Sequence, residues 1–534
     1  MRRLILISLL LLFIVETVSS SETKKINISY LYFGSPSSYL NQIDLTKNTL
    51  TAVSPNYLDI VANGELEITW KLDTSFISEM HRRGIKVVPF LSNHWDKPNG
   101  IAAVDQNAEK ITTDIAAAVS KYGFDGINVD IEGVGDAYRA KFTTFVQKIR
   151  AKIPAGKEVS VAVAANPQGW TTGWQGFYDY NELAKTSNYL MVMSYDESYD
   201  GGPSGPVASI DFFEKSLTYT INQGVPKSKI VMGVPFYGRI WKLDGPTLNG
   251  DNVQGLGVSN NKVAGILQKF GASESYDKVK QSPYCNITIP AGQSTFVAST
   301  ELTAGNYMLW YENETSIKQK ILVSNQYGVA GNGSWSLYQE TPATWDYFAR
   351  WQNGTYFADV SRTYWALDPI MFVSSKNWMT GNSTTFSPEQ NLSRAQAATI
   401  LVRALELTPK GSTNPFIDTK GHWAEADIRN AYSNGIVDGL DASHFKPNDP
   451  LTREQLSALL KRALQISDSS TNSPFTDVPK ASWSYSAIIS LYANGLIDGL
   501  TPTTFGPTKT STRAQMAAMM ARLAPRIDEK VAAP

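Results

Sequence analysis

The segment Asp125-Gly-Ile-Asn-Val-Asp-Ile-Glu132 carries the side chains best suited to chemistry. Side chains of a β-strand alternate between its two faces, so Asn128, Asp130 and Glu132 are predicted to share one face. A buried parallel strand is usually apolar on both faces, and a row of polar groups there is costly unless it serves a purpose. Carboxyl groups held in this way are candidates for proton transfer. A polar layer satisfied by internal hydrogen bonds is the alternative.

Eight short β-rich runs must position these residues, and they alternate with helical patterns between residue 26 and about residue 350. The runs begin at Lys25, Thr51, Ile85, Phe124, Glu158, Asn188, Lys229 and Gly328. This rhythm predicts an α/β fold, a (β/α)8 TIM barrel whose site lies at the C-terminal ends of the strands. A doubly wound open sheet is the alternative. The stretch from about 243 to 308 is predicted to be a small α+β insertion beside the site.

The composition narrows the possible partners. The chain is 42% hydrophobic and 11% aromatic, and its formal net charge is -1. Without a basic field there is no reason to expect nucleic acid, whereas the many Trp and Tyr residues favour a carbohydrate. No close-spaced metal-ligand motif and no phosphate-binding or dinucleotide fingerprint occurs in the sequence. We therefore expect neither a metal nor a cofactor. The His residues are His81, His94, His422 and His444.

The N-terminus resembles a secretory signal. A positively charged start, an apolar run over residues 4–15 and small residues before Ser21 predict a signal peptide over residues 1–20. The run is shorter than the ~20 residues needed to cross a bilayer, although an uncleaved anchor is the alternative. Without a second such run, the mature protein is predicted to be secreted and to lack a membrane span. Cys285 is a lone cysteine, so a secreted chain without disulfides favours a bacterial source.

The final third of the sequence holds three repeats, predicted over residues 355–406, 414–465 and 473–525. Each begins with Phe-x-Asp, continues with a Trp and an amphipathic stretch, and ends with a Ser or Thr, Arg, any residue and Gln. The hydroxyl residue and the Gln three positions later predict a capping box at a helix start. The repeats are therefore expected to be helical and to pack together. The three Trp, expected in the core, are Trp365, Trp423 and Trp483.

The first of these patterns resembles glycoside hydrolase family 18. The Asp125–Glu132 segment resembles its signature, in which Asp-Gly precedes alternating acidic residues that end in Glu. The segments Met193–Asp196 and Gly233–Arg239 resemble its sixth- and seventh-strand motifs, and Trp335 lies where an eighth-strand Trp would lie under the sugar. The resemblance covers the barrel, predicted over residues 21–350, and it implies the substrate-assisted mechanism of that family.

The resemblance implies a role for each matched residue. Glu132 is expected to be the general acid and base, Asp130 to orient the substrate acetamide, and Tyr195 to donate a hydrogen bond to it. Asp196 is expected to bind the sugar or support Tyr195, and Trp335 to form an apolar floor. The full set expected to bind substrate is Asn128, Asp125, Met193, Asp196, Tyr237, Arg239 and Trp335.

One position departs from the common pattern, because many members carry Asp where this chain has Asn128. An amide cannot take up a proton passed between carboxyls, so the charge coupling to Asp130 and the pH profile are expected to differ. The presence of Glu132 favours an active enzyme over a carbohydrate-binding protein that lost its acid. Nevertheless, a non-catalytic wall-binding protein remains the alternative.

The implied substrate is a polymer of β-linked N-acetylhexosamine. The stretch over residues 195–217 resembles the branch of the family that acts on spore cortex or cell-wall peptidoglycan more than it resembles typical chitinases. Peptidoglycan is therefore the expected substrate, and external chitin is the alternative.

The three repeats resemble S-layer homology domains, which implies attachment to an anionic secondary cell-wall polysaccharide. Arg394, Arg453 and Arg513 are each predicted in the first turn of a helix, where backbone N–H groups bind anions readily. They are the expected contacts for that polymer. The alternative is that they are solvated or form internal ion pairs. Together the two resemblances predict a glycosidase at the bacterial cell wall.

Overall fold

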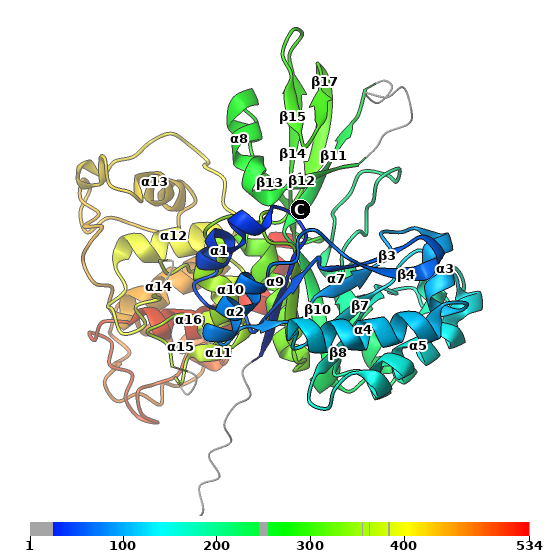
Figure 1. Cartoon of the computed structure of the whole chain (residues 1–534). Coiled ribbons are helices and arrows are strands. Elements are labelled where there is room, and N and C mark those ends of the chain that lie inside the picture. The colour runs from blue at the N-terminus through cyan, green and yellow to red at the C-terminus, as the bar shows by residue number, and fades with distance from the viewer. Residues whose placement is uncertain (1–24, 245–254, 355, 362–363, 383–384, 533–534) are drawn as a thin grey trace, which may run out of the picture.

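The computed structural model of the chain describes residues 25–244, 255–354, 356–361, 364–382 and 385–532. The predicted signal peptide over residues 1–20 lies outside these ranges. Of the helices within them, none combines the length and the apolar composition that crossing a membrane requires. Figure 1 shows a barrel, a subdomain that projects from it and a helical module beside it.

The predicted (β/α)8 barrel is confirmed, and each of the eight β-rich runs contributes a strand. Consecutive strands pair in parallel, and the last strand returns to pair with the first. The barrel strands are β1 (Ile26–Leu31), β2 (Ala52–Pro55) with β3 (Leu58–Val61), β5 (Lys86–Val87) with β6 (Phe90–Ser92), β7 (Gly126–Asp130), β8 (Glu158–Ala164), β9 (Tyr189–Met193), β10 (Ile230–Pro235) and β18 (Gly331–Trp335).

Two of the eight strands are interrupted. The second barrel strand consists of β2 and β3, and the third consists of β5 and β6. Their first segments, β2 and β5, pair with each other, and so do their second segments, β3 and β6. Pro89 lies at the second break and has no N–H to donate to a ladder. Because each pair of segments is continuous in the chain, the barrel closes through them. The antiparallel strand β4 (Glu65–Ile68) extends β3 at the rim.

Helices cover the outside of the barrel, and the strands are buried on both faces, as a parallel sheet requires. Asp73, Asp179 and Ser209 begin three of these helices by accepting hydrogen bonds from first-turn N–H groups. The helices are α1 (Pro36–Leu45), α2 (Thr74–Arg82), α3 (Lys97–Val104), α4 (Ala108–Tyr122), α5 (Arg139–Lys152), α6 (Tyr180–Thr186), α7 (Ile210–Asn222), α9 (Glu314–Tyr327) and α10 (Thr344–Gln352).

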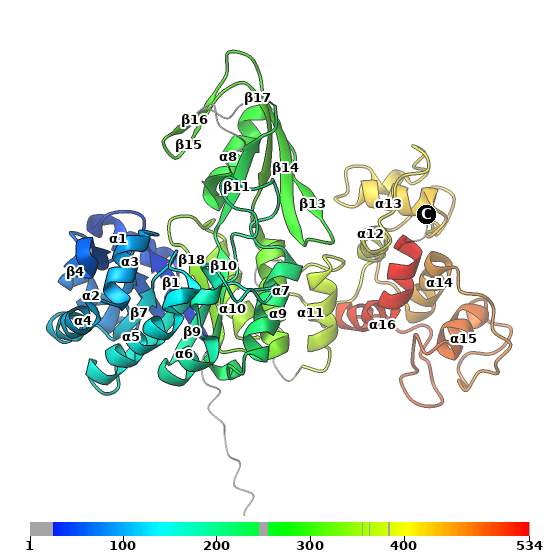
Figure 2. The same ribbon diagram turned by 90° about the vertical axis from the view of Figure 1, so that its right-hand side faces the viewer.

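The expected insertion is an antiparallel sheet in the order β12-β11-β17-β14-β13, with one helix packed against it. It begins at β11, directly after the C-terminal end of β10, so it rises from the face of the barrel on which those strand ends lie (Figure 2). Its elements are β11 (Tyr237–Lys242), β12 (Leu256–Ser259), α8 (Asn260–Phe270), β13 (Ser275–Asp277), β14 (Ser282–Ile289), β17 (Gly305–Trp310) and the hairpin of β15 (Thr295–Val297) and β16 (Thr300–Leu302).

The C-terminal module is helical, as expected. The predicted capping boxes form: the side chains of Ser393 and Gln396 each bond to the other's backbone, and Thr452 and Gln455 do the same. The first helix of the module packs against the last, so the three repeats close into a ring. The helices are α11 (Leu367–Ser375), α12 (Arg394–Ala404), α13 (Glu425–Ser433), α14 (Arg453–Leu464), α15 (Tyr485–Ala493) and α16 (Arg513–Ala532).

The repeated Arg residues join the repeats, which differs from their expected role as open contacts for an anionic polymer. The Arg453 guanidinium donates to the backbone oxygens of Phe505 at 2.8 Å and Asp498 at 2.8 Å, both in the next repeat. Arg394 reaches from repeat one to repeat two in the same way, and Arg513 reaches from repeat three back to repeat one. Each guanidinium is buried at a junction, because the helix start on which it lies faces the neighbouring repeat.

The prediction that Trp365, Trp423 and Trp483 lie in the core is wrong. Their exposed fractions are 62%, 63% and 65%. The core position in each repeat is filled instead by the Phe of Phe-x-Asp, which packs against a second Phe such as Phe445 or Phe505. The Asp fixes the turn that holds this second ring: Asp418, for example, accepts from the N–H groups of Phe445 and Lys446.

The barrel and the module share one apolar core. Asn325 of α9 donates to the Trp351 backbone oxygen at 2.8 Å and to the Tyr356 hydroxyl at 3.0 Å. The rings of Trp351 and Tyr356 lie 4.7 Å apart, and α11 packs against α9. Both views show the module beside the barrel, on the side of these helices (Figures 1 and 2).

The junction arginines should govern the stability of the module. Replacing Arg453 with Met keeps the apolar stem but leaves two backbone oxygens without their donors, at a cost of about 2–4 kcal/mol. We expect faster hydrogen exchange in α14 and α15 of the full-length variant. Arg462→Met is the matched control, because Arg462 lies on the same helix and forms an exposed ion pair with Asp438 and a long bond to the Ala458 backbone oxygen, with no donation to the next repeat among the described residues. Equal exchange rates in the two variants would contradict the junction role.

Candidate active site

The acidic segment ends at the mouth of the barrel. β7 places Asn128 and Asp130 on the inner face, and Glu132 follows just beyond the strand. Asn128 is fully buried: its Oδ1 accepts from the Tyr30 hydroxyl at 2.8 Å, and its Nδ2 donates to Ser160 at 2.9 Å. The amide at this position is therefore satisfied on both sides, and it holds the strand in register below the two carboxyls.

The residues expected from the sixth strand lie beside this pair. Met193 is the last residue of β9 and, by alternation from the inward Met191, points into the mouth. Tyr195 follows it, and its ring lies 6.2 Å from that of Tyr237. Asp196 is next and has a φ of 60°, a backbone conformation uncommon outside glycine, which turns its carboxylate toward the insertion.

Asp196 joins the barrel to the insertion. Its Oδ1 accepts from the Tyr237 hydroxyl at 2.8 Å and from Arg239 Nη2 at 2.7 Å. Arg239 also donates to the Gly255 backbone oxygen at 2.9 Å. Tyr237, Arg239 and Asp196 thus form a connected polar wall above Tyr195.

Trp335 closes the other side of the mouth. It is the last residue of β18, and its ring lies 5.3 Å from that of Tyr30, 5.7 Å from that of Tyr32 and 6.2 Å from that of Phe90. These aromatic rings form an apolar surface next to the carboxyls.

The structure corrects the placement of Asp125. Its carboxylate accepts from the Val87 N–H at 2.8 Å and pairs with His81 at 2.8 Å, at the N-terminal end of the strands. Asp125 lies there for two reasons. It precedes β7, so it is at the start of the strand, and because side chains alternate, its side chain faces away from that of Asn128. It therefore lies at the opposite end of the barrel from Glu132.

Three consecutive residues near Glu132 were missed by the sequence analysis: Asn93, His94 and Trp95. Asn93 bonds to the backbone of Glu132, and the Trp95 side chain lies near its carboxyl and lowers its pKa. His94 pairs with Asp59 at 2.8 Å, and its positive charge lowers the pKa of Asp130. The signal that could have found them was their place directly after a barrel strand, where the residues of a TIM-barrel site lie.

The environment separates the proton affinities of the two carboxyls. Burial raises the pKa of Glu132 well above its ordinary value, and the charges of Asp130 and Asp196 raise it further. Burial also raises the pKa of Asp130, but the positive charge of His94 opposes that rise. The pKa of His94 is itself raised by its hydrogen bond to Asp59, which favours the cation. Asp130 therefore ionises first, while Glu132 retains its proton.

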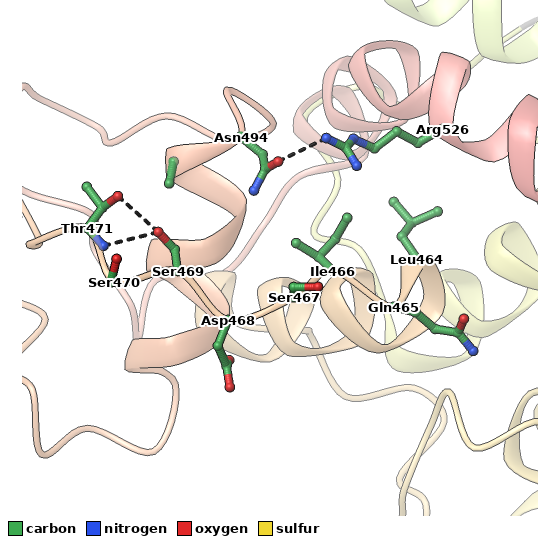
Figure 3. Close-up of a pocket in the computed structure, with 11 residues that line it drawn as sticks. Leu464, Gln465, Ile466, Ser467, Asp468, Ser469, Ser470, Thr471, Asn494 and Arg526 are labelled. Carbon is green, nitrogen blue, oxygen red and sulfur yellow. Dashed lines mark hydrogen bonds between the residues drawn. The ribbon is translucent and has the colours of Figure 1, made fainter.

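Other features of the described residues lie apart from this site. No group of three or more His, Cys, Asp or Glu residues that could hold a metal is found among them. A surface hollow of about 490 Å³ lies in the C-terminal module, where α14 and α15 end beside Arg526 of α16 (Figure 3). It is lined mainly by polar side chains, and Arg526 donates to Asn494 at 2.9 Å. None of the predicted site residues lines it.

Comparison with known families agrees with this geometry. The sequence profile described as "Glycosyl hydrolases family 18" matches residues 28–340, which span the barrel and its insertion. The chain belongs to glycosyl hydrolase family 18. The profile of the S-layer homology domain matches residues 356–398, 415–457 and 474–517, one segment for each predicted repeat. The chain thus combines a family 18 domain with three S-layer homology repeats, modules that attach proteins to bacterial cell-wall polymers.

Individual relatives include both cortex-lytic enzymes and chitinases. The cortical fragment-lytic enzyme of Bacillus anthracis is 24% identical over 237 residues, which are 44% of this chain and 51% of the relative. The chain thus spans about half the length of such curated relatives. The chitinase from Chromobacterium violaceum is 26% identical with a TM-score of 0.52, covering 61% of this chain and 98% of the chitinase. The Bacillus cereus spore cortex-lytic enzyme SleL is 21% identical with a TM-score of 0.52, covering 61% and 74%.

The charge of His94 should set the acid limb of the pH–rate profile. His94→Gln removes a cation that favours ionised Asp130, so the pKa of Asp130 rises and its carboxylate forms only at higher pH. We expect the acid limb of kcat to move upward by roughly half a pH unit or more. His81→Gln is the matched control, because it breaks the His–Asp pair at the far end of the barrel. An unchanged acid limb in His94→Gln would rule out this coupling.

Proposed function

We propose that this family 18 enzyme cleaves β-linked N-acetylhexosamine polymers by a substrate-assisted retaining mechanism, and that its main substrate is the glycan of peptidoglycan. The observation that carries the proposal is the separation of the two carboxyls at the end of β7: burial and neighbouring charges keep Glu132 protonated, whereas His94 favours ionised Asp130. A protonated acid beside an ionised carboxylate is what the first step of this mechanism requires.

In that step Glu132 gives its proton to the leaving glycosidic oxygen as the bond to the anomeric carbon breaks. The acetamido oxygen of the substrate attacks the same carbon from the other side and forms a cyclic oxazolinium ion. Glu132, now ionised, then takes a proton from a water molecule that opens the ring. One protein carboxyl thus serves both proton transfers, and the configuration at the anomeric carbon is retained.

The neighbouring residues support the acetamido group. Ionised Asp130 accepts the acetamide N–H and offsets the positive charge of the oxazolinium ion. The Tyr195 hydroxyl donates to the acetamide oxygen, and the pKa of Tyr195, raised first by burial, keeps that hydroxyl protonated. The Asp196–Tyr237–Arg239 wall fixes the loop that carries Tyr195, and the ring of Trp335 lies beneath the sugar. Asn128 holds the base of β7 and exchanges no proton.

Two observations support a glycan polymer as the substrate. Two large aromatic side chains stay exposed on loops that follow barrel strands, where sugar faces can stack: Phe33 and Tyr199. The insertion rises from the same face and adds a wall to it. Peptidoglycan is favoured over chitin because the anchoring repeats hold the enzyme at a cell wall and a relative is a cortical fragment-lytic enzyme. External chitin is the second candidate, supported by the chitinase from Chromobacterium violaceum.

The location follows from the same parts of the chain. Secretion through the signal peptide predicted over residues 1–20 would deliver the protein to the outer surface. The repeats over residues 355–406, 414–465 and 473–525 would then hold it on an anionic wall polysaccharide. The catalytic unit over residues 21–350 needs no cofactor for the proposed chemistry.

Loss of the acid should abolish turnover. Glu132→Gln keeps the shape of the side chain but cannot donate or accept a proton, so kcat should fall by at least about 10²–10⁴-fold. The measurement is the release of new reducing ends from purified peptidoglycan and from chitin oligosaccharides by the wild type and the variant.

The two substrates distinguish the candidates. Release from peptidoglycan that disappears in Glu132→Gln supports the proposed function. Release from chitin alone would move the substrate to an external polymer. Binding without release from either substrate would show a carbohydrate-binding protein rather than an enzyme.

The repeats should be needed for attachment and not for catalysis. A variant without residues 355–534 is expected to stay in solution when cell walls are sedimented, whereas the full chain pellets with them. Its activity on soluble oligosaccharides should remain close to that of the full chain, because the described site residues all lie before residue 340. Sedimentation of the truncated enzyme with walls would contradict attachment through the repeats.

A further inference from the structure

The turn that follows β6 makes direct contact with the main chain of Glu132. Asn93, which is 1% exposed, donates from Nδ2 to the Glu132 backbone oxygen at 2.8 Å. Its Oδ1 accepts from the Glu132 N–H at 2.8 Å. A third bond, from Nδ2 to the Asp96 backbone oxygen at 3.0 Å, fixes the orientation of the amide. One buried side chain therefore holds both backbone polar groups of the residue that carries the acid.

This contact begins where the sheet ends. The ladder between β6 and β7 runs through Phe90–Asn128 and Leu91–Val129 and stops at Ser92–Asp130. Glu132 lies beyond the last pair, so no neighbouring strand supports its backbone. The Asn93 amide supplies the missing donor and acceptor, and Gly100 leaves just enough room for it, since a Cβ there would lie 2.8 Å from Asn93 Nδ2.

The next two residues turn their side chains toward the same place. His94 and Trp95 have φ angles of 45° and 62°, a region that non-glycine residues rarely occupy. The Trp95 side chain lies close enough to the Glu132 carboxyl to lower its pKa, and its ring lies 5.1 Å from that of Trp174. Gly133 allows this approach, because a Cβ there would lie 3.1 Å from the Trp95 ring. Strained backbone that brings a side chain to a reacting group is typical of functional sites.

We propose that Asn93 and Trp95 are positioning residues for Glu132, with Asn93 fixing its backbone and Trp95, whose ring packs against the adjacent Gly133, limiting the orientations of its carboxyl. This inference rests on the proposed function of Glu132 as the proton carrier. Proton transfer to the leaving oxygen needs the carboxyl within hydrogen-bond reach in a defined orientation. Glu132 lies on irregular backbone past the strand end, so without the two contacts the carboxyl has several orientations, of which few are productive.

The first test compares Asn93→Ala with Asn166→Ala. Asn166, which is also 1% exposed and follows β8, forms the same paired bonds to the backbone of Trp170, both at 2.8 Å. These bonds go to Trp170 and not to Glu132, so the replacement removes an equivalent side-chain contact elsewhere on the barrel rim. We expect kcat of Asn93→Ala to fall by about 10²-fold with KM little changed. In Asn166→Ala, both kcat and its pH dependence should stay close to those of the wild type.

The second test is Trp95→Phe, which keeps an aromatic ring at this position but removes the N–H together with the larger indole. The Trp95 side chain lowers the pKa of Glu132, because it favours the ionised carboxylate. Its replacement should raise the pKa of Glu132, so the protonated acid persists to higher pH. We expect the basic limb of kcat to move upward by about one pH unit. Loss of packing alone would leave the basic limb in place.

The outcomes separate this inference from the proposed function. If the wild type releases reducing ends and Glu132→Gln does not, the proposed function stands. An Asn93→Ala variant with wild-type kcat, or a Trp95→Phe variant with a wild-type basic limb, would then overturn the positioning role of that residue. If the wild type releases nothing from either glycan, the proposed function itself fails. A matching drop in kcat in Asn166→Ala would show a general effect of rim stability and would also overturn the role of Asn93.

Discussion

The arrangement of the barrel mouth depends on the burial of two carboxyl groups, those of Asp130 and Glu132, at the end of β7. Burial of Asp130 and Glu132 favours their neutral forms, and each would raise the pKa of the other if both were charged. The surrounding elements resolve this conflict unequally. β1 and β8 supply partners to the neutral amide of Asn128 below, whereas the turn after β6 supplies a cation to one carboxyl and the Trp95 side chain to the other. The asymmetry of the neighbours is what gives two similar groups different tasks.

The C-terminal module depends on a comparable buried charge. Each junction Arg loses water, and desolvation lowers the pKa of Arg394, Arg453 and Arg513, yet backbone oxygens and a Phe ring of the next repeat compensate the guanidinium. Because the third repeat returns to the first, no junction is left open. This use of the Arg residues leaves the exposed Trp of each repeat on the outside. A short repeat that buries little apolar surface alone gains its stability from these contacts between neighbours.

Features encoded locally were predictable from the sequence, and features that depend on distant contacts were not. The eight β-rich runs and the capping boxes at Ser393 and Thr452 involve residues close in the chain, so periodicity and spacing were sufficient. The Asn93 contact joins residues 39 positions apart and exists only because β6 pairs with β7. Likewise, amphipathic spacing cannot tell which aromatic of a repeat is buried, and the partner of each junction Arg lies in another repeat. The error at Asp125 was different, since strand parity alone separates it from Asn128.

The shared core between barrel and module affects how the enzyme reaches substrate around its point of attachment. An enzyme on a flexible linker explores a sphere whose radius grows with the length of the linker, and the local concentration of substrate follows from that length. Here Asn325 and Trp351 contact Tyr356 at the start of the module, and α11 packs against α9, so packed contacts take the place of such a linker. Once the module is bound, the direction of the barrel mouth relative to the wall is set. If the wall glycan is the substrate, as proposed, orientation and distance select among nearby glycan strands before any sugar enters the mouth.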